Sequence, residues 1–143
     1  MRWEDIQVFR VVQKNAELAM KAVDTVSDKT YDDDLALHLS RQSLKYSELR
    51  NQAAGKLLSA HLEPSRKNVV EEMVVAGTMH RDTLLNTSTS HIAELIIQES
   101  SRKISKLCQS LHKYENAGEE AVEMAREFMD FEESNIRQLR KFL

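Results

Sequence analysis

The chain has 143 residues, a formal net charge of −3 and a single cysteine. Its length is typical of one domain and allows a sizeable core without a disulfide or a metal. Cys108 excludes an internal disulfide framework, and we expect it to be a small buried hydrophobe in a reducing compartment. Charges of both signs are interspersed, without a basic stripe, so no nucleic-acid partner is expected.

The composition predicts an all-α protein. One proline and three glycines in the whole chain leave few sites for turns, whereas helix-forming residues are abundant. No window approaches the roughly 18 consecutive apolar residues of a membrane span. The first 20 residues carry charges among their apolar positions, unlike a secretion signal. We therefore expect a cytoplasmic protein that does not bind membranes.

Apolar residues recur at spacings of three and four along most of the chain. This pattern predicts long helices over about residues 3–26, 32–61, 90–114 and 119–142, and a shorter helix over about 65–85. Thr30 is the expected N-cap of the second helix, and Ser90 is a candidate N-cap for the fourth. We expect residues 1–143 to form one domain, a four-helix bundle built from the helices of matched length.

The shorter helix is the unusual element of this pattern. A segment of this length between the second and third long helices can carry the chain along the bundle, which is the crossover arrangement of ferritin-like folds. Its spacing predicts that Val70, Met73, Val74 and Gly77 pack against the long helices. A glycine inside a helix costs about 1 kcal/mol relative to alanine, so Gly77 is expected at a close helix contact.

A ferritin-like metal centre would require Glu-x-x-His pairs on two helices. No glutamate in this chain is followed by a histidine three residues later. The nearest features are three helical pairs of an acid and a histidine, which favour solvation or ion pairing and leave a metal site as the alternative. These pairs are His91 with Glu94, His112 with Glu115, and Asp34 with His38.

Two further groups of polar residues have alternative interpretations. His80 and Arg81 suit a helix end or an ion pair, and a basic pocket for an anionic ligand is the alternative. Four polar residues near the midpoints of the long helices favour a buried polar network over a cofactor site; they are Gln13, Gln42, Ser100 and Asn135. Hydrolase, P-loop and dinucleotide motifs are absent. We therefore assign no catalytic or metal-binding residue, expect no cofactor, and favour a non-enzymatic role.

The segment from Met79 to Arg81, together with Arg41, Tyr46 and Leu49, resembles an uncharacterised bacterial branch of the ferritin-like superfamily, a domain of unknown function. The resemblance implies two long helices, a shorter connecting helix that ends near a His-Arg pair, and two further long helices. Because both Glu-x-x-His motifs are missing, ferroxidase, iron-storage and oxygenase activities are not expected.

The leading hypothesis is a non-enzymatic ferritin-like bundle that acts through self-association or protein interaction, with a homodimer favoured. Its basis is a set of apolar positions outside the narrow helix stripes, which could form a dimer seam or belong to a wide core face. These positions are Val8, Val11, Leu37, Ile96 and Met129. The alternative is a degenerate metal-binding protein with an oxidative or stress-related role.

Overall fold

The computed structural model describes all 143 residues as five α-helices and a short 3-10 helix. This result confirms the all-α prediction and the order of four long helices with a shorter one between the second and third. The elements are α1 (Trp3–Ser27), α2 (Asp33–Ser59), α3 (Val69–Asp82), α4 (Thr89–Lys113), α5 (Glu119–Leu139) and η1 (Arg140–Phe142). None of these helices has the length and apolar content that crossing a membrane requires.

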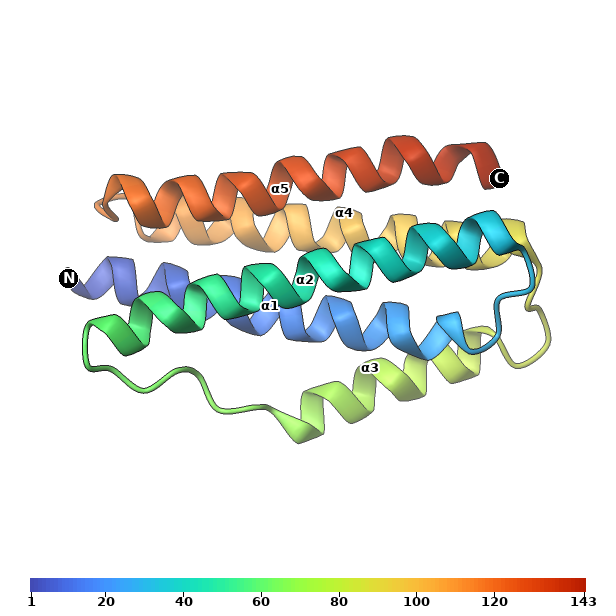
Figure 1. Ribbon diagram of the computed structural model, residues 1–143, viewed down its shortest axis with the longest axis horizontal. Helices are drawn as coiled ribbons and strands as arrows, with labels where there is room; N and C mark the ends of the chain where they lie inside the picture. The colour runs from blue at the N-terminus through green and yellow to red at the C-terminus, as the bar shows by residue number, and fades with distance from the viewer.

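The long helices form a bundle in which α1 contacts every other α-helix (Figure 1). The ribbon shows α1 and α5 running in one direction and α2 and α4 in the opposite one. The chain returns from the end of α2 through an irregular segment and α3, which packs along α1. The four long helices therefore follow the order up, down, down, up.

The core of the bundle contains 23 buried apolar residues, among them Phe9, Tyr46 and Phe128 of the long helices and Met79 of α3. Most of the apolar positions that the sequence analysis considered for a dimer seam also belong to this core or pack against it. Val8 and Ile96 lie inside the core, and Val11 and Met129 pack against it; only Leu37 remains about half exposed. Four of the five positions therefore belong to a wide core face, and Leu37 does not.

At the start of α2 and of α4, the observed N-cap is not the predicted residue. The Asp32 carboxylate caps α2 by accepting a hydrogen bond of 2.9 Å from the Leu35 amide, whereas the Thr30 hydroxyl donates to the Val26 carbonyl. The Ser88 hydroxyl, rather than that of Ser90, accepts from the backbone of α4. In each case a nearby side chain already satisfies a free N–H group of the first turn.

The chain between α2 and α3 is irregular, so α3 begins four residues later than predicted. Ser65 lies in this segment, and the Gln13 side chain holds it against α1. The Gln13 amide donates to the Ser65 carbonyl at 3.0 Å and accepts from the Ser65 N–H at 3.0 Å. A buried glutamine thus replaces the helical hydrogen bonds that the backbone of Ser65 would otherwise make.

The orientation of α3 contradicts the predicted packing. Met79 is 2% exposed and Val75 is partly buried against the core, whereas Val70, Met73 and Val74 are 63–70% exposed. A Cβ atom added at Gly77 would meet no atom within 4 Å, so Gly77 marks no close contact. Val70 and Val74 share one face of α3, and Val75 and Met79 share another. The helix buries the face with Val75 and Met79, whereas the spacing predicted burial of the face with Val70 and Val74.

Cys108 also differs from expectation, since it is exposed on α4. The adjacent Leu107 occupies the core position of that helix turn. Successive residues of a helix point about 100° apart, so the thiol is directed away from the bundle interior.

Candidate functional site

The bundle encloses a fully buried carboxyl group at Glu132 of α5. Its Oε1 atom accepts hydrogen bonds from the Tyr46 hydroxyl at 2.6 Å, from Asn135 Nδ2 at 2.9 Å and from the Ser100 hydroxyl at 3.3 Å. The Oε2 atom is buried without a hydrogen-bond partner. Three helices thus supply polar groups to one point in an otherwise apolar interior.

A chain of hydrogen bonds connects this carboxyl group to the bundle surface along α2. His38 Nε2 donates to Gln42 Oε1 at 3.1 Å, and Gln42 Nε2 donates to the Tyr46 hydroxyl oxygen at 2.7 Å. Tyr46 then donates to Glu132. Each donor points towards the carboxyl group, which fixes the Nε2–H tautomer of the imidazole.

Helical spacing explains how the sequence assembles this cluster. His38, Gln42 and Tyr46 follow one another at intervals of four residues and therefore share one side of α2. Glu132 and Asn135 are three residues apart on the inward side of α5. The packing of α2 against α5 brings the two sets together.

Burial changes the protonation of these groups. It raises the pKa of Glu132, and the hydrogen bonds from Tyr46 and Asn135 oppose that shift only in part. Burial and the nearby Glu132 carboxylate raise the pKa of Tyr46 well above its ordinary value. Burial lowers the pKa of Lys103, which the charges of Glu99 and Glu132 oppose. It also lowers the pKa of His38, so its imidazole favours the neutral form.

The raised pKa of Glu132 predicts a specific pH dependence of stability. A carboxyl group that holds its proton more tightly when folded stabilises the fold fully below about pH 4.5, its ordinary pKa, and this contribution is lost as the pH rises through the raised value. We expect the unfolding free energy of the wild type, relative to that of Glu132→Gln, to fall over this interval. Urea denaturation of both proteins between pH 4 and pH 8 measures this difference in unfolding free energy. Tyr46 and Lys103 reduce the shift in the pKa of Glu132 and therefore affect its size.

Glu133→Gln is the matched control, because Glu133 lies on the exposed side of α5. Its stability relative to the wild type should change little over the same pH interval. A wild-type stability that rises with pH relative to that of Glu132→Gln, or that does not change, would contradict the raised pKa.

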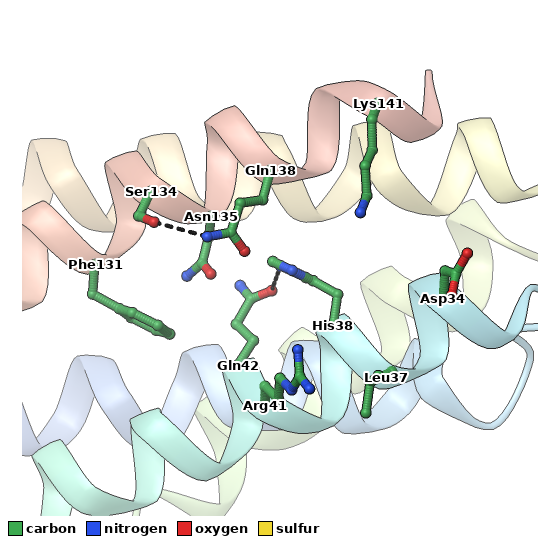
Figure 2. Close-up of a pocket in the computed structure, with 10 residues that line it drawn as sticks. All are labelled: Asp34, Leu37, His38, Arg41, Gln42, Phe131, Ser134, Asn135, Gln138 and Lys141. Carbon is green, nitrogen blue, oxygen red and sulfur yellow. Dashed lines mark hydrogen bonds between the residues drawn. The ribbon is translucent and has the colours of Figure 1, made fainter.

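A cavity of about 290 Å³ lies between α2 and the C-terminal part of the chain, next to the buried cluster (Figure 2). Side chains from α2 and α5 extend towards one another across it. Its lining residues are Asp34, Leu37, His38, Arg41, Gln42, Phe131, Ser134, Asn135, Gln138 and Lys141. The cavity is therefore mostly polar, and the hydrogen-bond chain from Glu132 ends in its wall at His38.

The predicted polar network is only partly formed by the residues chosen from the sequence. Gln42, Ser100 and Asn135 belong to one connected network, but Gln13 binds the Ser65 backbone instead. Glu132, the centre of the network, was missed. Its position was detectable, since it follows Phe128 by four residues and precedes Leu139 by seven on the apolar stripe of α5.

The three pairs of an acid and a histidine lie in different surroundings in the structure. His91 Nε2 lies 2.7 Å from the Asp82 carbonyl oxygen, and Glu94 is exposed. His112 and Glu115 are also exposed. Asp34 and His38 both line the cavity described above. No three histidine, cysteine or acidic side chains come together in a group that could hold a metal ion.

His80 and Arg81 lie on the exposed side of α3. Arg81 Nε is 3.3 Å from the Asp82 carboxylate, so Arg81 forms one of the ion pairs expected from the sequence.

Comparison of the chain with protein-family models, curated proteins and solved structures gives no match.

Proposed function

We propose that the chain is a non-enzymatic, ferritin-like bundle that forms a homodimer through the exposed side of α3. We call this surface the α3 stripe and define it as Val70, Met73, Val74 and Gly77 of α3 together with Leu84, which lies two residues after the end of the helix. The observation that carries the proposal is the exposure of its apolar side chains, from 63% at Val74 to 76% at Leu84. A helix that directs a row of apolar side chains into solvent is typical of a protein contact surface.

The ferritin-like part of the proposal rests on the helix order. The directions up, down, down, up require one long connection between the second and third long helices, as in ferritin-like bundles. The irregular segment and α3 provide that connection along α1. A crossover helix lies at the edge of such a bundle, so its outer side remains free to bind a partner.

A second copy of the chain fits the α3 stripe because its four helical positions are spaced symmetrically. Val70 and Gly77 lie three residues on either side of the pair Met73 and Val74. Two antiparallel α3 helices that cross between Met73 and Val74 would therefore place Met73 against the partner's Val74 and Val70 against the partner's Gly77, each twice. The absence of a side chain at Gly77 would allow the two helices to approach closely. A twofold dimer needs such a self-complementary surface.

The contact area indicates how strong this dimer should be. The helix α3 has 14 residues and is about 21 Å long, and a helix is about 10 Å wide. The contact would thus cover about 200 Å² per copy, against about 800 Å² in a standard interface. We expect a dissociation constant on the order of 100 µM.

Sedimentation velocity over about 5 to 500 µM protein tests the dimer. The wild type should shift from monomer towards dimer, whereas Met73→Glu should remain monomeric because it places charges in the apolar contact. Leu58→Glu is the matched control, since Leu58 is 58% exposed on α2 and lies outside the stripe. Thermal melting checks that both variants fold.

Two results would overturn the proposed dimer. The first is a wild-type protein that stays monomeric at the highest concentration. The second is equal loss of association in Leu58→Glu and Met73→Glu, which would place the contact elsewhere. The metal-binding alternative is not proposed, because no observation brings its ligands together.

A further inference from the structure

We propose that the cavity between α2 and α5 binds a small organic carboxylate that also carries a hydroxyl or amino group. The cavity lies away from the α3 stripe, so this proposal is independent of the dimer. Its volume of about 290 Å³ approaches the lower limit of typical small-ligand pockets, about 300 Å³. Its wall combines free positive charge with buried amide groups.

The positive charge comes from Arg41 and Lys141, which line opposite sides of the cavity on α2 and η1 (Figure 2). Neither side chain forms an ion pair within the protein. The only acidic residue in the wall is Asp34, at the opposite end of the cavity from Phe131. Two cations and one anion leave a net positive charge, which favours an anionic ligand.

The amide groups indicate the second feature of the ligand. Gln42 and Asn135 are 1% and 3% exposed, so they form a buried polar part of the wall. Asn135 Nδ2 donates to Glu132, whereas its Oδ1 atom has no hydrogen-bond partner within the protein. A hydroxyl or amino group of the ligand could donate to this oxygen while its carboxylate contacts the cations.

The amide groups are held in place before any ligand binds. Gln42 is held on one side by His38 and on the other by Tyr46, and Asn135 is held by Glu132. Such fixed groups lower the ordering cost of binding. The buried network therefore acts as support for the cavity wall.

Lactate, propionate and lactamide are suitable probes, because propionate lacks the hydroxyl group and lactamide lacks the charge. Each is titrated to about 50 mM at constant ionic strength while the side-chain amide NMR signals of Gln42 and Asn135 are followed. We expect lactate to shift both signals to saturation in the millimolar range. Propionate should bind about threefold more weakly and lactamide about tenfold more weakly.

Substitutions locate the site. Arg41→Gln and Lys141→Gln should each weaken lactate binding by about fivefold, because each removes one unpaired cation. Arg137→Gln is the control, since Arg137 is an exposed cation of α5 outside this cavity. A lactate response that does not saturate, an equal response to lactamide, or equal weakening by Arg137→Gln would each overturn the proposal. Met73→Glu should bind lactate like the wild type, so a failed dimer leaves this test intact.

Discussion

Glu132→Ala should lower the free energy of unfolding by about 3 to 5 kcal/mol. The substitution removes the acceptor of the Tyr46 hydroxyl and of Asn135 Nδ2 and leaves both donors buried without partners. It also opens a cavity at a fully buried position. Because a destabilisation of this size moves the unfolding midpoint of a domain of this length by roughly 10 to 20 °C, thermal melting at neutral pH will detect it.

Two further variants make this result specific. Glu132→Gln keeps an oxygen acceptor for the donors and should cost clearly less than Glu132→Ala. Glu133→Ala changes the exposed neighbour and should stay within about 0.5 kcal/mol of the wild type. If Glu132→Ala melts like Glu133→Ala, the buried network does not stabilise the bundle.

Met79→Ala should destabilise the protein by about 2 to 5 kcal/mol, whereas Met73→Ala should change its stability by no more than about 0.5 kcal/mol. The two methionines lie on opposite sides of α3. Met79 is 2% exposed and belongs to the core, but Met73 is 67% exposed. Urea denaturation measures the unfolding free energy of both variants at a few micromolar protein, a concentration at which the proposed dimer is dissociated.

This pair of variants distinguishes the two possible orientations of α3. Equal costs would mean that both sides of the helix are covered in the monomer. A larger loss of stability in Met73→Ala than in Met79→Ala would mean that α3 packs as the sequence spacing predicted. The exposed surface on which the proposed dimer depends would then not exist.

The long helices were predictable because each carries an apolar side with helical spacing, interrupted by polar residues only near its midpoint. For α1 the predicted and observed ends differ by only one residue, at Ser27. The start of α3 was less predictable, since the exchange of hydrogen bonds between Gln13 and Ser65 depends on the irregular segment lying against α1. No local signal in the sequence identifies a contact between residues 52 positions apart.

The candidate site was predictable in its parts but not as a whole. The midpoint positions of Gln42, Ser100 and Asn135 indicated a polar layer. The role of Glu132 depends on its burial among side chains from three helices, and the cavity depends on the spacing between α2 and α5. Neither relation follows from the order of residues along a single helix.

The sequence by itself determined that the chain forms five helices in this order, because backbone preference and apolar spacing act within each segment. Tertiary structure alone decided which side of α3 faces α1, since Val75 with Met79 and Val70 with Val74 both have helical spacing. It also decided that Glu132 is buried with a raised pKa. Burial and electrostatic environment are set by neighbours that are distant in the chain, and only their packing brings these neighbours together.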